Sequence, residues 1–136
     1  MDPLELNAGR FHLRPLRHDS RVDDVPALRL VHGGDADAGH VDRAAADWAA
    51  DRVYRWAVAE QTHVDLVAEA SVTPVDGPGG SAAIVEVLPA GDVDRIIPVD
   101  DPDVEPVTVG EACRAARDVV TRFAQEALER TVDSDG

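Results

Sequence analysis

The sequence contains no lysine, and its charge is strongly one-sided. All 13 basic residues among the 136 are arginines, against 27 Asp and Glu, so the formal net charge at pH 7 is −14. A field of that sign repels the phosphates of nucleic acids and the surfaces of anionic membranes. Nucleic acid and membrane are therefore not expected as partners, and a polyanionic cofactor would need a local basic pocket.

Cysteines, aromatic residues and long apolar runs are also scarce. The single cysteine, Cys113, excludes an internal disulfide and is expected to be a buried structural thiol. Only 4% of residues are aromatic, so the core has to be built from Val, Ala and Leu. The opening MDPLELNAGR lacks the apolar run of a signal peptide, and no stretch is long enough to cross a bilayer. A cytoplasmic protein is expected.

The apolar residues, 44% of the chain, suffice for the core of one domain. Alternating apolar residues predict strands, and apolar residues spaced three and four apart predict helices. The expected strands are 10–16, 54–61, 63–73 and 82–89. The expected helices are 41–53 and 110–129, with a short helix or turn within 20–31. The fold class that follows is α+β (α/β mixed), a mainly antiparallel sheet flanked by helices, in one domain over 1–130 with a disordered tail over 131–136.

The helix expected over 110–129 carries the clearest local signal. Thr108 stands three residues before Glu111, which is the spacing of a capping box at a helix N-terminus. Apolar side chains then recur on one face of the helix: Ala112, Ala116, Val119, Val120, Phe123 and Ala127. Such a stripe predicts a helix that packs on the sheet.

A family resemblance rests on four stretches and on their order along residues 4–130. They are LELNAGRFHLRPLRHDSRVDDVPAL, AAADWAADRVYRWAVAEQ, VDLVAEASVTPV followed by SAAIVEVLP, and GEACRAARDVVTRFAQEAL. In this order they resemble the GNAT superfamily of acetyl-CoA-dependent N-acetyltransferases, in particular the branch that acetylates the N-termini of ribosomal proteins. The first stretch looks like that branch's opening strand, which ends in LRP, and the last looks like the helix that follows its cofactor loop.

The resemblance implies a fold, a cofactor and site residues. It places acetyl-CoA at the start of the helix over 110–129, with Val87, Leu88, Val109 and Gly110 at cofactor-binding positions. It places Glu86 on the strand where some relatives hold a catalytic carboxylate that deprotonates the acceptor amine. The competing interpretation of Glu86 is an ordinary strand carboxylate that faces solvent.

The junction VDDPDVEPVTVGEA (99–112) departs from the family pattern. Members carry a Gln/Arg-x-x-Gly-x-Gly/Ala loop there, in which backbone amides approach pyrophosphate. In this chain Val107 and Val109 stand at the glycine positions, and Arg95 is the sole cation between residues 90 and 113. The sequence also ends before the segments that follow this helix in relatives, so the C-terminal part of the family fold is expected to be missing.

Two functions from different classes follow. The first is a degenerate GNAT-like protein that has lost acyl-CoA-dependent transfer, needs no cofactor and binds a protein partner or small ligand. The alternative is an active acetyl-CoA-dependent N-acetyltransferase with an atypical cofactor loop. The apolar strand IVEVL (84–88) has no following strand to pair with, which predicts a homodimer through residues 82–99.

The segment HGGDADAGH (32–40) contains side chains that ligate metals. His32 and His40 flank it, and Asp35, Asp37 and Asp42 lie within or beside it. The spacing matches neither an EF-hand nor an established zinc pattern. A solvated loop is therefore expected, and no metal site is predicted.

Overall fold

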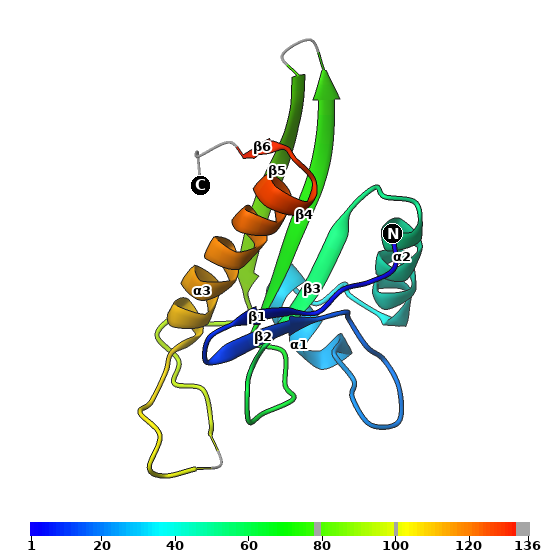
Figure 1. Cartoon of the computed structure of the whole chain (residues 1–136). Coiled ribbons are helices and arrows are strands. Elements are labelled where there is room, and N and C mark those ends of the chain that lie inside the picture. The colour runs from blue at the N-terminus through cyan, green and yellow to red at the C-terminus, as the bar shows by residue number, and fades with distance from the viewer. Residues whose placement is uncertain (78–79, 100, 133–136) are drawn as a thin grey trace.

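A six-stranded sheet whose strands lie side by side in chain order forms the centre of the protein (Figure 1). The structure is a computed structural model that describes residues 1–77, 80–99 and 101–132. The strands are β1 (Leu6–Ala8), β2 (Phe11–Arg14), β3 (Tyr54–Glu60), β4 (Ala68–Gly77), β5 (Gly80–Pro89) and β6 (Thr131–Val132). Neighbours from β1 to β5 pair antiparallel, and β6 pairs parallel to β5 at Ala82 and Ala83. The sequence prediction of an α+β fold with a mainly antiparallel sheet is confirmed.

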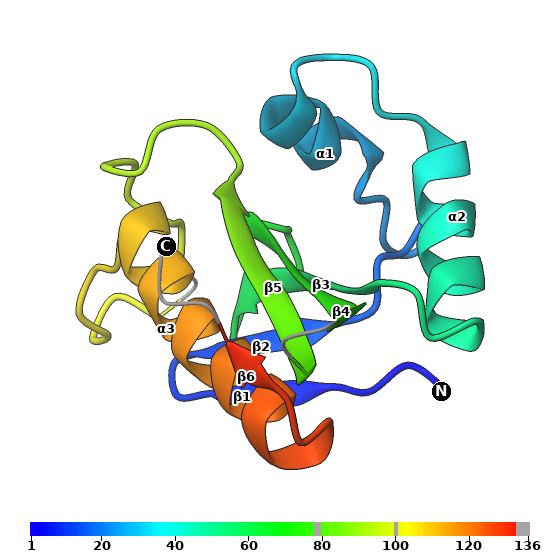
Figure 2. The same ribbon diagram turned by 90° about the horizontal axis from the view of Figure 1, so that it is seen from above.

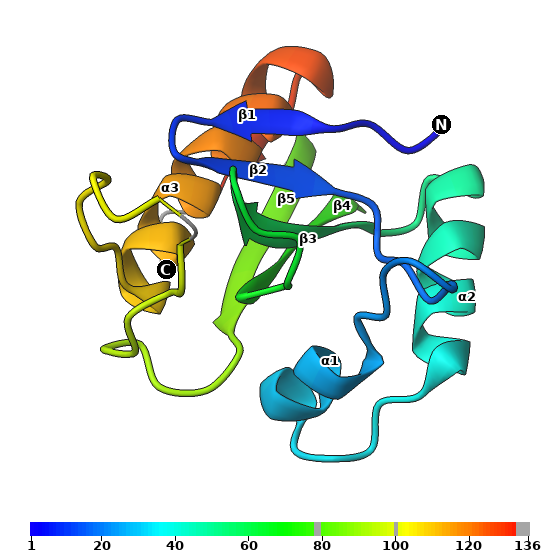
Figure 3. The same ribbon diagram turned by 90° about the horizontal axis from the view of Figure 1, so that it is seen from below.

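Helices cover both faces of this sheet. The helices are α1 (Val25–His32), α2 (Ala38–Ala49) and α3 (Val109–Arg122), and α3 continues as one π-helical turn, η1 (Phe123–Ala127). Views from above and below place α3 on one side of the sheet and α1 and α2 on the other (Figure 2, Figure 3). Among the described residues, no helix has both the length and the apolar character that a membrane crossing requires.

The two covered faces explain why both sides of the central strands are buried. On β4, Ala68, Ala70 and Val72 pack with α3, and Glu69 and Ser71 project from the opposite face. All five are buried, because α1 and α2 close that second face. Alternation in the sequence therefore assigns each side chain to a face correctly, but it does not reveal that both faces are covered.

The scarce aromatic residues gather where α2, β3 and η1 meet. Ring centroids lie 4.8 Å apart for Trp48 and Tyr54, 5.1 Å for Trp48 and Trp56, and 5.2 Å for Trp56 and Phe123. The tilted and edge-on orientations are those that aromatic pairs prefer. Buried Val, Ala and Leu side chains supply most of the remaining core, as the composition predicts.

The observed boundaries correct several predictions. The strand expected over 10–16 is confirmed for Phe11–Arg14, and the helix or turn expected within 20–31 is α1, with Pro26 in its first turn, where no amide partner is needed. The strand expected over 63–73 begins only at Ala68, because the chain turns between Gln61 and Val67. The three-residue β1 was not predicted, since its apolar pattern is too short to detect.

The C-terminal prediction is also corrected in part. Thr131 and Val132, expected to belong to a disordered tail, form β6 beside the start of β5. Residues 133–136, the rest of that expected tail, lie outside the described residues. The edge of β5 beyond Ala83 pairs with no other strand in the part of the chain that the structure describes.

Candidate functional site

The start of α3 is the position where the resemblance places a cofactor. The amide of Val109 donates to the Arg95 carbonyl at 3.0 Å, and the amide of Gly110 donates to the Val93 carbonyl at 2.8 Å. The amide of Glu111 donates to Thr108 Oγ1 at 3.2 Å, which confirms the predicted N-cap. The first three amides of α3 therefore have acceptors within the protein.

Gly110 allows this close approach of the loop backbone. A Cβ atom at this position would lie 3.2 Å from the Val93 carbonyl oxygen, tighter than ordinary contact. The glycine thus serves helix–loop packing here. Of the other positions that the resemblance assigns to the cofactor, Val87 and Val109 belong to the core beneath α3, and Leu88 is half-buried on β5.

The sequence also singles out Glu86 and Cys113. Glu86 is exposed on β5 opposite Ser71 of β4, and within the described residues it has no hydrogen-bond or ion-pair partner. Its catalytic role remains a prediction. Cys113 is half-buried on α3 against the core, and burial raises the pKa of its thiol, although Arg117 and Arg114 oppose the shift. A thiol in that state is a weak nucleophile at neutral pH.

Two histidines converge on one buried glutamate between α1, α2 and β4. His32 Nε2 lies 2.9 Å from Glu69 Oε1, and His40 Nε2 lies 2.8 Å from Glu69 Oε2. The Glu69 side chain is 1% exposed, whereas those of His40 and His32 are 17% and 29% exposed. The guanidinium of Arg55 approaches Oε1 more loosely, at 3.5 Å.

The solvated loop expected over 32–40 is therefore wrong for its two histidines. They meet Glu69, which the sequence did not single out because it comes from a distant strand. The aspartates of the segment lie elsewhere: Asp37 caps α2 through the amide of His40 at 3.3 Å, and Asp35 and Asp42 are exposed. The available signal is that Glu69 is the lone carboxylate in AEAS (68–71), a run whose other residues are small.

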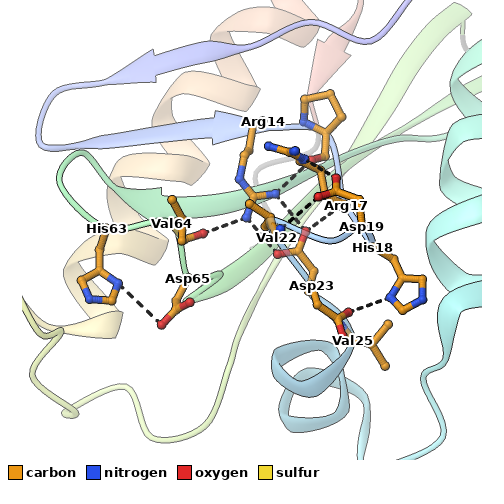
Figure 4. Close-up of polar contacts among 12 residues, drawn as sticks. Arg14, Arg17, His18, Asp19, Val22, Asp23, Val25, His63, Val64 and Asp65 are labelled. Atoms are coloured by element: carbon orange, nitrogen blue, oxygen red, sulfur yellow. Dashed lines mark hydrogen bonds and ion pairs between the residues drawn. The ribbon is translucent and has the colours of Figure 1, made fainter.

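A buried ion pair joins the end of β2 to the start of α1 (Figure 4). Arg14 donates from both terminal nitrogens to the two carboxylate oxygens of Asp24, at 2.9 and 2.8 Å. Asp24 also accepts from the amide of Arg17 at 2.7 Å, and Arg14 donates to the Val64 carbonyl at 2.8 Å. These contacts fix the β3–β4 connection against α1.

Two histidine–carboxylate pairs with exposed carboxylates flank this ion pair (Figure 4). His18 Nδ1 lies 2.8 Å from Asp23, and His63 Nδ1 lies 3.5 Å from Asp65. The hydrogen bond with Asp23 raises the pKa of His18 and lowers the pKa of Asp23. Asp23, on the rim of this region, is therefore an ionised carboxylate at neutral pH.

A pocket of about 480 Å³ opens beside these residues. Its walls come from α1, from the β3–β4 connection and from the loop after β5. Leu30, Leu66 and Ile97 supply apolar surface, and Asp23, His63, Asp65 and Arg95 supply polar groups. The arrangement combines a mostly apolar wall with two carboxylates and one guanidinium, which suits a small ligand with a charged group.

Comparison of the chain with protein-family models, with curated proteins and with solved structures gave no match.

Proposed function

We propose that this protein is a GNAT-related ligand-binding protein that does not use acyl-CoA. The observation that carries the proposal is the engagement of the first three amides of α3 by Arg95, Val93 and Thr108. Phosphate binding at a helix N-terminus depends on free amide donors. A cofactor seated there would have to displace the loop over 93–95 and leave its carbonyls without partners.

The charge of the surrounding segment supports the same conclusion. The loop between β5 and α3 contains several aspartates and Glu105, and its one cation, Arg95, donates to the Ala90 carbonyl at 3.2 Å. A multiply charged anion placed in that loop would meet repulsion with little compensation. We expect acetyl-CoA to bind more weakly than about 1 mM.

We propose the pocket beside α1 as the ligand site, and a small amine with an apolar body as the ligand class. Asp23 and Asp65 offer carboxylates to a protonated amine, and Leu30, Leu66 and Ile97 offer apolar contact. The net charge of −14 adds a field that favours cationic ligands over anionic ones.

Thermal unfolding in the presence of ligand tests both parts of the proposal, because a ligand that binds only the native state raises the melting temperature. Acetyl-CoA at ~100 µM is expected to leave the melting temperature unchanged. Phenethylamine is expected to raise it, and the uncharged 2-phenylethanol is expected to raise it less.

Two matched variants locate the amine. Asp65→Asn removes a carboxylate from the pocket, and Asp118→Asn removes one from the exposed face of α3. Only Asp65→Asn should reduce the effect of phenethylamine. Stabilisation by micromolar acetyl-CoA would overturn the proposal and favour the acetyltransferase alternative, and equal effects of amine and alcohol would refute the amine site.

A further inference from the structure

Two imidazoles and one guanidinium surround the buried carboxylate of Glu69. A buried carboxylate needs partners that compensate its charge, and here most of the close contacts come from histidine. Among the described residues, Arg55 is the only permanently charged partner of Glu69, yet at 3.5 Å it is the most distant. The two close partners are imidazoles, which bind metal ions when neutral.

Three separate elements hold the donors in place. His32 is the last residue of α1, where Gly33 caps the helix in the left-handed conformation at φ 81°. His40 lies in the first turn of α2, behind the Asp37 cap, and Glu69 lies on β4 beneath both helices. The two imidazole rings lie 4.9 Å apart. The donors are therefore arranged by the fold before any ion binds.

We propose that His32 Nε2, His40 Nε2 and the Glu69 carboxylate bind one divalent transition-metal ion of the Zn²⁺ class. One donor atom from each residue lies within 4.8 Å of the other two. Zinc bonds to nitrogen and oxygen are about 2.0–2.2 Å long, so tetrahedral donors stand roughly 3.3 Å apart. The His–Glu contacts have to widen by about half an ångström to admit the ion.

Proton balance follows from the hydrogen bonds that the ion replaces. In the metal-free cluster each imidazole donates an Nε2 proton to Glu69, or shares one with it. To bind the ion, each Nε2 must be free of a proton, so the neutral ring carries its one proton on Nδ1. If a ring holds a proton on both nitrogens beforehand, the proton on Nε2 passes to solvent. Glu69 binds the ion as a carboxylate, and its charge offsets half of the charge of the ion.

The donor set also indicates which ions fit. Imidazole nitrogens favour Zn²⁺, Co²⁺, Ni²⁺ and Cu²⁺, whereas Mg²⁺ and Ca²⁺ prefer sites made of oxygen. Three protein ligands leave a fourth position, and the partial exposure of His32 and His40 places it on the solvent side. A two-histidine, one-carboxylate set with an open position is the arrangement of catalytic rather than structural zinc sites. None of these three residues lines the amine pocket.

Titration of the chelator-treated full chain with Co²⁺ tests the site. We expect saturable binding of one ion per chain with the visible absorption of four-coordinate Co²⁺, and displacement of that ion by Zn²⁺. His40→Gln and Glu69→Gln should each weaken Co²⁺ binding at least tenfold. His18→Gln removes another histidine beside a carboxylate, at an exposed position, and should leave binding unchanged.

A measurement on the wild-type chain keeps the test independent of how the variants fold. Of the five histidine ring resonances in the NMR spectrum, those of His32 and His40 should shift on addition of Zn²⁺. Mg²⁺ at the same concentration should shift neither. No saturable Co²⁺ binding, wild-type Co²⁺ affinity in both cluster variants, or shifts centred on the other histidines would overturn the proposal.

Discussion

The only tyrosine, Tyr54, is buried in the aromatic cluster and donates its hydroxyl hydrogen to Asp51 at 2.9 Å. Burial, followed by the hydrogen bond to the Asp51 carboxylate, raises the pKa of Tyr54 from 10.0 to about 12. Because the folded pKa lies above the unfolded one, the stabilising contribution is complete below about pH 10 and is lost as the pH rises towards 12. Titration of tyrosinate absorbance should therefore show a midpoint near 12 in the native protein.

Matched conditions separate the causes of this shift. In urea the midpoint should fall to the ordinary value for tyrosine. Asp51→Asn removes the carboxylate but leaves the burial, so the native midpoint should fall only in part. A native midpoint close to that in urea would contradict the environment described for Tyr54.

Two adjacent aspartates, Asp23 and Asp24, provide a second test at the residue scale. Asp24 is 1% exposed and binds Arg14, whereas Asp23 is exposed and binds His18. Asp24→Asn leaves the Arg14 guanidinium buried without its counterion, which should lower the free energy of unfolding by about 3–5 kcal/mol. Asp23→Asn should change the midpoint of urea unfolding much less, and equal shifts for the two variants would contradict a special role for the buried pair.

Buried charged residues with partners far along the chain, such as Arg14 and Glu69, are the hardest to predict from the sequence. In the strand over 10–16, alternation placed Arg14 opposite Phe11 and Leu13, but it did not show that α1 covers the second face and brings Asp24 to it. Glu69 was missed for the same reason. The chemistry of both residues depends on partners far along the chain, and local periodicity carries no information about such partners.

At the scale of elements, the N-terminus of α3 is stabilised by the Thr108 side chain. Thr108→Ala removes the side-chain acceptor for the Glu111 amide and should lower the free energy of unfolding by about 1 kcal/mol. Thr108→Ser keeps a hydroxyl acceptor and should retain most of that stability. Urea denaturation of the two variants beside wild type measures the difference, and a serine variant as unstable as the alanine variant would refute the cap.

The elements that were predictable are those with strong local signals. The α3 cap and stripe, the alternation in β3, the mostly apolar run of β5, and the helical spacing in α2 are each recognisable from the sequence. The short strands β1 and β6 were not, because three and two residues offer too little pattern and their pairing depends on neighbours already in place. The early end of α2, at Ala49, follows from the tight turn after it, in which Asp51 adopts a positive φ of 56°.

For the whole molecule, we propose a homodimer through residues 82–99. The span contains exposed Ile84, Val93 and Ile96, together with the part of the β5 edge that lacks a partner strand among the described residues. The segment over 94–99 does not cover that edge, since Ile96 bridges to Thr108 and Ile97 is buried. An uncovered strand edge with apolar side chains favours association.

Sedimentation velocity at tens of micromolar protein should detect the dimer at physiological salt. The dimer should dissociate at low salt, because the repulsion between two chains of charge −14 is screened over about 8 Å only when salt is present. Ile84→Thr should weaken it without changing charge. Val64→Thr, at a similarly exposed position outside the span, should leave the dimer unchanged. A monomer under all conditions would refute this interface.

The chain order of the sheet has a consequence for synthesis on the ribosome. Each strand from β2 to β5 pairs with a strand that has already been made, so the sheet can grow as the chain emerges. The face under α3 cannot close in the same way, because α3 packs on β1 to β5 and is made after all of them. A nascent chain that ends before residue 109 therefore carries a nearly complete sheet with one uncovered apolar face, and exposed surface of this kind favours aggregation until α3 covers it.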